Sequence, residues 1–315
     1  MEIAPLHDTL ADAPAGGIAQ FLTARDGTRI RVAHWEGGTR GTVLLMPGRT
    51  EFIEKYGLTI ARLIGMGFAV VCIDWRGQGL STRIHGTTEL GHVEHFDEYQ
   101  QDVELMMQVA ASLPRPLHLF AHSMGGCIGL RALIRGLPVI SATFSAPMWG
   151  LHLPAVQGAV APFAVRMLRT FGRGQDYAPG ARGAKHVKLE SYEGNPLTTD
   201  PEQYARMRML VREVPDLDLG PPSVGWLAAA FDEMAALYNE DLPPVPMLAG
   251  CGTDETVVAY SDVVSQLERA PVGAFLPLDG ARHELFMETP ALQDQFWSAI
   301  ETHIQKCEAI AAAEV

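Results

Sequence analysis

The stretch FAHSMGGCIG, residues 120–129, places a single serine among small residues. A Walker phosphate loop would require GxxxxGK[ST] and a dinucleotide loop would require GxGxxG, and these glycines fit neither pattern. The stretch does fit small-x-Ser-x-Gly between a strand and a helix, with Ala121 and Gly125 at the small positions. Such a turn would hold the Ser123 hydroxyl at a helix N-terminus, where backbone N–H groups favour a developing negative charge. We therefore consider Ser123 a candidate nucleophile.

Residues that could activate this serine follow later in the chain. His283 lies in LDGARHELFMETP, directly after a predicted strand, and the carboxylates Asp254 and Glu255 follow another strand in AGCGTDETVV. A histidine can take the serine proton, and a carboxylate can hold the histidine in the required tautomer. The alternative for Ser123, an ordinary turn with a buried serine, does not account for the other two groups. At this point either Asp254 or Glu255 could be the acid.

The elements that must position these groups alternate between strands and helices. A hairpin is predicted at 18–24 and 28–35 around Asp26-Gly27, after a leader that we expect to be disordered. The predicted later strands are 41–48, 68–74, 116–123, 139–147, 245–252 and 273–280, and the predicted helices are 51–66, 96–113, 124–135, 261–268 and a last one from 290. This alternation predicts a mostly parallel sheet flanked by helices.

The alternation stops between residues 148 and 241, where helical patches at 156–171 and 201–214 are separated by Gly- and Pro-rich joints. We therefore predict an α/β core formed by residues 1–147 and 242–315, with a helical insertion at 148–241 that could serve as a lid. The insertion is rich in Met, Trp, Phe and Leu. These side chains could line an apolar acyl pocket, or could simply pack the insertion onto the core.

The composition excludes several other classes of protein. The formal net charge of −13 disfavours binding to nucleic acid or tight binding to an anionic membrane. The four cysteines, which are widely spaced, are expected to be free thiols in a reducing compartment. No signal peptide or membrane span is predicted, so we expect a cytoplasmic protein. The histidines in GHVEHFDE, residues 91–98, superficially suggest a metal site, but we expect a solvated surface there.

Four segments together resemble the α/β-hydrolase superfamily: MPGRTEFIEKYG, IDWRGQGLS, LFAHSMGG and GARHELFMETP. Within it, the chain is most similar to the lysophospholipase L2, monoacylglycerol lipase and serine aminopeptidase S33 group. The resemblance covers roughly residues 18–147 and 242–306 of the core, and the insertion carries no specific resemblance. From its place next to Ser123, His122 is expected to shape the nucleophile turn rather than to act as the base. The resemblance implies that Asp74–Ser81 is a structural turn. It implies no metal or organic cofactor.

The resemblance also implies roles for individual residues. Ser123 would be the nucleophile and His283 the base, while the backbone N–H groups of Met124 and Arg49 would form the oxyanion hole. Relatives have His where this chain has Pro47, which leaves the backbone donor in place. The family register of Gly, two residues, then the acid favours Glu255, with Asp254 as the alternative.

The expected substrate is a small ester or a monoacyl lipid, with transient membrane contact through apolar faces of the insertion. One alternative is an aminopeptidase or amide hydrolase, which would bind a substrate amine through an acidic residue such as Asp176, Glu190 or Glu193. The other is a non-catalytic binding protein of the same fold. That alternative is disfavoured because such proteins usually lose a member of the Ser-His-acid set, and all three are present here. The oligomeric state is not predicted.

Overall fold

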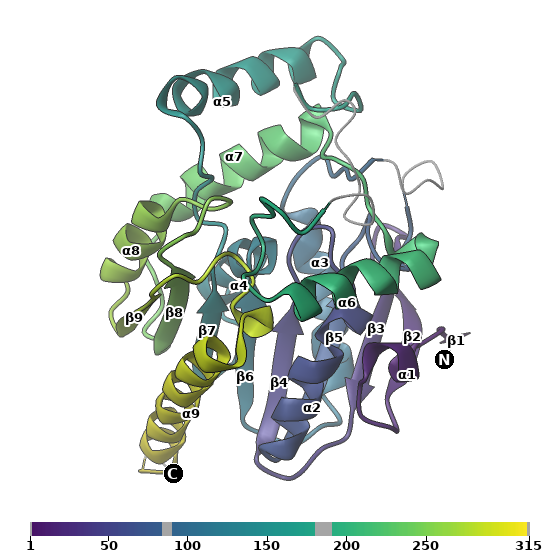
Figure 1. The fold of residues 1–315 in the computed structure, drawn as a ribbon, viewed down its shortest axis with the longest axis vertical. Helices are drawn as coiled ribbons and strands as arrows, with labels where there is room; N and C mark the ends of the chain where they lie inside the picture. Colours follow the sequence, from purple (N-terminus) through teal and green to yellow (C-terminus); the bar gives the residue numbers. More distant parts are fainter. Residues whose placement is uncertain (1, 84–89, 180–190, 314–315) are drawn as a thin grey trace.

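A computed structural model describes residues 2–83, 90–179 and 191–313 of the chain. Its centre is a nine-stranded sheet with the order β1-β2-β3-β5-β4-β6-β7-β8-β9 (Figure 1). The strands are β1 (Glu2–Ile3), β2 (Ile18–Thr23), β3 (Arg29–Trp35), β4 (Gly41–Met46), β5 (Phe68–Asp74), β6 (Leu117–His122), β7 (Ser141–Ser145), β8 (Met247–Gly252) and β9 (Gly273–Leu278).

The sheet is antiparallel at the edge formed by β1, β2 and β3 and parallel from β5 to β9. Every residue of β4, β5, β6, β7 and β8 is buried, as expected for parallel strands that are covered on both faces. The predicted hairpin and the six later predicted strands are therefore all present. Because the parallel strands share one direction, the loops after β4, β6, β8 and β9 meet at one edge of the sheet.

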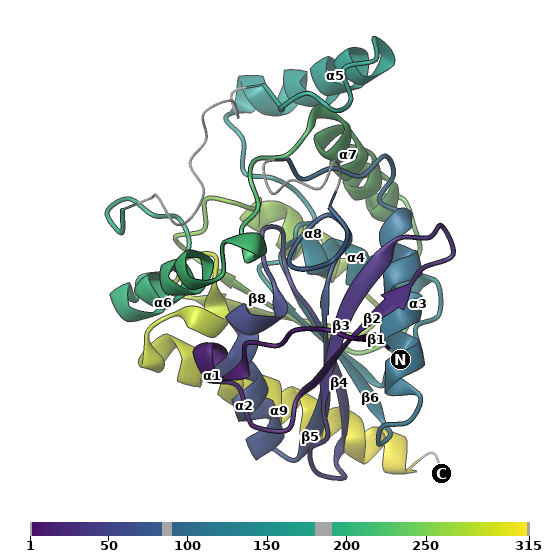
Figure 2. The ribbon, with the colours of Figure 1, turned by 90° about the vertical axis from the view of Figure 1, so that its right-hand side faces the viewer.

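Helices cover both faces of the sheet (Figure 2). The helices α2 (Gly57–Gly65) and α9 (Pro290–Ala313) lie on one face, together with the short helices η1 (Ile53–Tyr56) and η5 (Leu285–Met287). The helices α3 (Glu98–Ala110), α4 (Met124–Ile134) and α8 (Tyr260–Glu268) lie on the other. The predicted helix at 51–66 is thus divided into η1 and α2.

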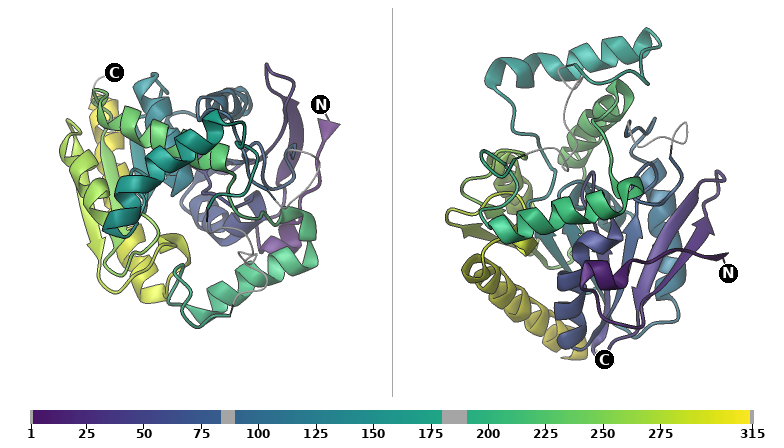
Figure 3. Two further views of the ribbon diagram at one scale, coloured as in Figure 1. Left: turned by 90° about the horizontal axis from the view of Figure 1, so that it is seen from above. Right: turned by 45° about the vertical axis from the view of Figure 1, so that its right-hand side comes forward.

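The chain between β7 and β8 forms the helices α5 (Ala155–Thr170), α6 (Pro201–Glu213), η4 (Pro215–Leu217) and α7 (Val224–Tyr238). Asp200 caps α6 by accepting the N–H groups of Glu202 and Gln203, and Ser223 caps α7 by accepting the Trp226 N–H. The helix α5 lies farthest from the sheet, with α7 beneath it, and α6 crosses separately at the side of α2 (Figures 1 and 3).

The N-terminal segment differs from the predicted disordered leader. Its β1 pairs with β2, and α1 (Asp8–Ala11) packs against the start of α2, where the Ala11 carbonyl lies so close to Gly57 that an added Cβ would be 1.9 Å from it. The His7 N–H also donates to Glu54 Oε1 over 3.2 Å. The prediction failed because this order comes from contacts with distant parts of the chain, which a polar, Pro- and Gly-containing segment does not reveal.

All four cysteines are free and buried, as predicted. Within residues 2–83, 90–179 and 191–313, no helix has the length and apolar character needed to cross a membrane.

Candidate active site

Ser123 stands between the end of β6 and the start of α4 with φ 48° and ψ −118°. This left-handed conformation is unfavourable for serine and costs on the order of 1–3 kcal/mol. Packing around the turn holds it in place: a Cβ at Gly125 would lie 2.2 Å from the Met46 carbonyl oxygen, and one at Gly126 would lie 2.5 Å from Pro147 Cβ. The glycines therefore let α4 approach β4 and the loop after β7, and the positive φ falls on the serine itself.

His283 lies between Ser123 and Glu255. Its Nε2 is 3.0 Å from Ser123 Oγ, and its Nδ1 is 2.7 Å from Glu255 Oε2. Of the two candidate carboxylates, Glu255 is buried and contacts the histidine, whereas Asp254 is exposed at the surface. The distances suit a neutral His283 that donates from Nδ1 to Glu255 and accepts the serine proton at Nε2.

Glu255 stays ionised because its surroundings favour the carboxylate. Burial alone would raise its pKa, but the hydrogen bond from His283 outweighs that effect, together with the positive charge of His283 when it is protonated and two backbone donors. These donors are the N–H groups of Val257 and Val258, which lie 2.6 and 3.2 Å from Oε1. The net result is a pKa below the ordinary value of 4.5.

The loop that carries His283 is held by residues 195–199. The Glu284 N–H donates to the Leu197 carbonyl over 2.8 Å, and Arg282 Nη1 donates to the carbonyls of Asn195 and Thr198. The buried Glu288 accepts the Arg282 N–H at 2.7 Å and the Thr199 N–H at 3.0 Å. Part of the chain between β7 and β8 thus positions the histidine loop.

The residues predicted for the oxyanion hole lie beside the serine. A Cβ at Gly48 would be 3.0 Å from Ser123 Cβ, so the loop after β4 touches the nucleophile. The Arg49 N–H has no acceptor among the described residues, and Met124 is the first residue of α4, where an N–H has no partner within the helix. Thr50, the next residue in the loop, has a positive φ of 64°.

The turn Asp74–Ser81 supports this loop. Trp75 Nε1 donates to the Pro47 carbonyl over 2.8 Å, and Gln78 Nε2 donates to the Gly48 carbonyl over 2.8 Å. The Asp74 carboxylate accepts the Ile53 and Leu80 N–H groups over 2.9 and 2.7 Å. These contacts agree with the structural role predicted for the turn.

A buried ionic network next to the site was not identified from the sequence. Lys55 Nζ contacts Glu51 Oε1 and lies 2.7 Å from Glu284 Oε1. The other Glu51 oxygen accepts the Gly48 N–H and the Tyr56 hydroxyl, the latter over 2.5 Å. Glu51 therefore ties Lys55 to the predicted oxyanion loop. The one feature of the sequence that could have indicated this network is Glu284, a carboxylate directly after the candidate base.

His122 completes this network beneath the serine turn. Its Nε2 is 3.3 Å from Glu284 Oε2, and its Nδ1 is 3.0 Å from the Ser145 carbonyl oxygen. Burial lowers the pKa of His122, but the carboxylates of Glu284 and Glu51 raise it by more. Burial raises the pKa of Glu284, but Lys55 and His122 lower it well below the ordinary value.

The carboxylates of Glu51 and Glu284 lie close enough to His122 to form a metal-binding set by distance alone. The Lys55 ammonium is bonded to both carboxylates and supplies the positive charge at this position. The geometry thus describes an ion network centred on lysine.

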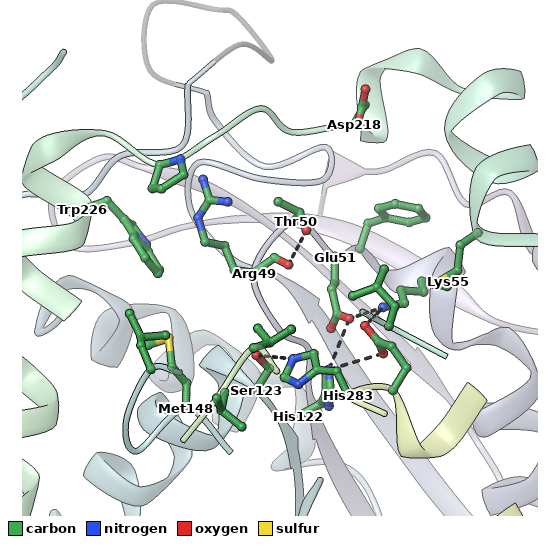
Figure 4. A pocket seen from close by; sticks show the side chains of 18 of the residues that line it. Arg49, Thr50, Glu51, Lys55, His122, Ser123, Met148, Asp218, Trp226 and His283 are labelled. Atoms are coloured by element: carbon green, nitrogen blue, oxygen red, sulfur yellow. Dashed lines mark hydrogen bonds and ion pairs between the residues drawn. The ribbon is translucent and has the colours of Figure 1, made fainter. Parts of the chain in front are cut away.

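A pocket of about 330 Å³ opens over Ser123 (Figure 4). Its apolar lining includes Met148, Leu151, Trp226 and Leu227 from the chain between β7 and β8, and Val258 from the core. The polar groups on its wall come mainly from the serine, the histidine loop and the loop after β4. The cavity therefore combines an apolar wall, which can accommodate an acyl chain, with polar groups close to the serine.

His92 differs from the solvated surface predicted for residues 91–98. It is buried, its Nδ1 is 2.6 Å from Ser223 Oγ, and its Nε2 is 3.0 Å from Glu94. The prediction failed because Ser223, which covers the histidine, is distant in sequence.

Comparison with known proteins identifies related chains. The family described as "Serine aminopeptidase, S33" matches residues 37–290, which is most of the chain. Lysophospholipase L2 of Escherichia coli K12 is 29% identical over 273 residues, covering 82% of this chain and 78% of that protein.

Solved structures show the same fold. Monoglyceride lipase from Saccharomyces cerevisiae superimposes with a TM-score of 0.73 at 20% identity, covering 92% of this chain and 96% of that one. A carboxyl esterase from Bacillus coagulans gives 0.74 at 17% identity, covering 93% and 99%. At these identities the likeness concerns the fold, and it confirms the α/β-hydrolase architecture predicted from the sequence.

Proposed function

Because the chain belongs to the serine aminopeptidase S33 family of α/β-hydrolases, we propose that it is a serine hydrolase that cleaves carboxylic esters. The observation that carries this proposal is the hydrogen-bonded series Ser123–His283–Glu255 at the base of an apolar pocket. In this proposal, Ser123 is the nucleophile, His283 the base and Glu255 the acid, with Asp254 on the surface.

In the first half of the reaction, His283 Nε2 accepts the Ser123 proton while Oγ attacks the ester carbonyl carbon. The carbonyl oxygen becomes an oxyanion that accepts the Arg49 and Met124 N–H groups, and Glu255 stabilises the imidazolium. When the tetrahedral intermediate collapses, the C–O bond to the alcohol breaks. The leaving oxygen takes the proton from His283, and an acyl-Ser123 ester remains.

In the second half, a water molecule takes the place of the alcohol. His283 accepts one of its protons while the oxygen attacks the acyl carbon, and the bond from that carbon to Ser123 Oγ then breaks. The proton returns to the serine and the carboxylic acid leaves. Each step uses groups of this chain and water.

For the substrate, we propose a monoacyl lipid, either a lysophospholipid or a monoacylglycerol. Two observations support this class: the apolar lining contributed by Met148, Leu151 and Trp226, and the activities for which two similar proteins are named, lysophospholipase L2 and monoglyceride lipase. A pocket of about 330 Å³ suits one acyl chain better than two.

The amide-hydrolase alternative has less support. It needs an acidic group to bind a substrate amine. Of the carboxylates in the pocket wall, Glu51 and Glu284 are bonded to Lys55, and Asp218 accepts the Leu219 N–H over 3.1 Å. Of the residues suggested from the sequence, Asp176 lines a separate cavity and pairs with Arg173, and Glu193 is exposed. Glu190 lies outside the described residues.

We further propose that residues 148–241 act as a lid that can contact a lipid surface. On α5, apolar side chains at helical spacing are exposed, namely Val156, Val160, Phe163, Met167 and Phe171 just beyond its end. This face belongs to the helix farthest from the sheet (Figure 1). Sedimentation with neutral lipid vesicles should decrease when Phe163 is replaced by Asp, and unchanged sedimentation would contradict the contact.

The catalytic proposal is tested with Ser123→Ala. This variant should fold normally and should lose turnover of p-nitrophenyl esters, lysophospholipid and monoacylglycerol alike. A fluorophosphonate probe should label Ser123 of the wild type, as identified by peptide mass spectrometry. Turnover retained by the variant would refute the nucleophile. Faster turnover of aminoacyl-anilides than of esters by the wild type would favour the amide alternative.

A further inference from the structure

The Arg49 side chain lines the same cavity as Ser123 (Figure 4). No carboxylate oxygen of the described residues lies within 4.0 Å of its guanidinium. Lys55, the other cationic side chain in the cavity wall, is bonded to both Glu51 and Glu284. Arg49 thus differs from Lys55, because no carboxylate in the described part of the chain is paired with its charge.

The contacts that Arg49 does make fix its position and leave hydrogen-bonding capacity unused. Its Nη2 donates to the Gly220 carbonyl over 3.0 Å, and its guanidinium carbon lies 4.9 Å from the centre of the Trp226 ring. Its Nε is buried and has no acceptor among the described residues. Burial lowers the pKa of Arg49 to about 10, so the group remains charged at neutral pH.

A buried cation without an anion is unfavourable unless another group balances its charge. An anionic ligand in the cavity would supply this balance. Carboxylates and phosphates both suit the planar guanidinium, because two N–H groups can donate to either in parallel. Of these two anions, phosphate is the one that a monoacyl phospholipid substrate would carry.

We propose that Arg49 binds the phosphate of a monoacyl phospholipid whose ester carbonyl is held at Ser123. This inference rests on the proposed ester-hydrolase function and adds the head group to it. In such a lipid, a chain of covalent bonds through the glycerol joins the ester carbon to the phosphorus atom. The chain of bonds from the Arg49 backbone nitrogen to its guanidinium carbon has the same number of bonds. One residue can therefore serve both ends of the substrate: its N–H meets the carbonyl oxygen and its guanidinium meets the phosphate.

The test compares two substrates that carry the same acyl chain, lysophosphatidylcholine and monoacylglycerol, presented in the same neutral detergent. The quantity measured is the ratio of their kcat/KM values. Arg49→Gln should lower this ratio about 10- to 100-fold, the loss expected for a charge-assisted hydrogen bond. Arg49→Lys keeps the charge and loses the planar fork, so its substrate ratio should lie between that of the wild type and that of Arg49→Gln.

The matched control is Arg166→Gln. Arg166 also lies between β7 and β8, but it pairs with Asp232 at the surface and is absent from the wall of the Ser123 pocket. Its substitution removes the same charge and should leave the substrate ratio unchanged. A ratio unaffected by Arg49→Gln, or lowered equally by Arg166→Gln, would overturn the proposal. If Arg49→Gln fails to fold, as judged by thermal melting, the decision rests on the ratio for Arg49→Lys.

A second measurement separates a lipid head group from free phosphate. Glycerol 3-phosphate and inorganic phosphate are compared as inhibitors of p-nitrophenyl ester hydrolysis. Stronger inhibition by glycerol 3-phosphate, weakened in Arg49→Gln, supports the head-group site. Equal inhibition by inorganic phosphate would instead assign a free-phosphate site and overturn the lipid assignment. These measurements test the head-group site separately from the catalytic role of Ser123. The catalytic proposal fails if Ser123→Ala stays active, whatever the substrate ratio of the Arg49 variants.

Discussion

His283 and His122 are neighbouring buried histidines, with ring centroids 4.8 Å apart, and each faces a glutamate. Their remaining nitrogens differ. His283 Nε2 meets the Ser123 hydroxyl, whereas His122 Nδ1 meets the Ser145 carbonyl oxygen within the sheet. Their glutamates differ too, since Glu255 is supported by backbone N–H groups and Glu284 by the Lys55 ammonium.

Burial and a carboxylate partner are common to both histidines, so these two features do not by themselves identify a base. A base also needs a group from which it can take a proton, and it must be able to release that proton to the substrate. His122 has carboxylates on one side and the β7 backbone on the other. We therefore assign it a positioning role under the serine turn.

The largest expected difference between the two histidines is in turnover. His283→Ala should lower kcat for a p-nitrophenyl ester by about 10⁴-fold or more, because the serine loses its base. His122→Ala should lower kcat far less, about tenfold, and should mainly lower the melting temperature. Steady-state kinetics and thermal unfolding of both variants measure this. Equal losses of kcat would contradict the division of roles.

The next difference concerns the adjacent carboxylates. Glu255→Gln should lower kcat by about 10²- to 10⁴-fold, because an amide cannot hold the imidazolium as a carboxylate does. Asp254→Asn, on the exposed neighbour, should change kcat less than twofold. If the two variants lose activity equally, the assignment of Glu255 as the acid fails.

The smallest expected effect is a pH dependence of stability in the Lys55 network. The pKa of Glu284 is lower in the folded chain than in the unfolded chain, so the unfolded chain binds more protons between the two values. The stabilisation from ionised Glu284 is therefore fully present above about pH 4.5 and is lost as the pH falls through the depressed folded value.

Glu284→Gln should accordingly lower the free energy of unfolding by about 1–3 kcal/mol at pH 7, with a smaller difference below pH 4. Urea unfolding of the wild type and the variant at several pH values measures this. The Glu284 effect must be separated from that of His122, whose raised pKa stabilises the fold at low pH and loses that effect as pH rises above about 6.5. A difference that grows toward pH 4 would contradict this account.

The parts of the site that depend on a short continuous segment could be predicted from the sequence. The serine turn needs small residues at fixed positions, and the parallel strands are continuous apolar runs. Each of these patterns can be recognised within a single segment. The register from Gly252 to Glu255 favoured the carboxylate that contacts His283 in the structure.

The parts that depend on distant contacts could not be predicted in this way. Lys55 and Glu51 have the spacing of a solvated helical ion pair, and only the fold shows that Glu284 closes over them. The buried state of His92 depends in the same way on Ser223. Charged residues buried among apolar ones leave little trace in a hydrophobic pattern.

The helix α5 has one buried residue, Val165, among the sixteen that form it, and it packs mainly on α7. Little buried apolar surface therefore becomes exposed to water when this helix separates from the molecule. Such a local opening needs far less free energy than unfolding of the sheet. The segment that holds the His283 loop is a different one, at residues 195–199. The helix α5 can thus separate by a local opening while Ser123, His283 and Glu255 keep their contacts with one another.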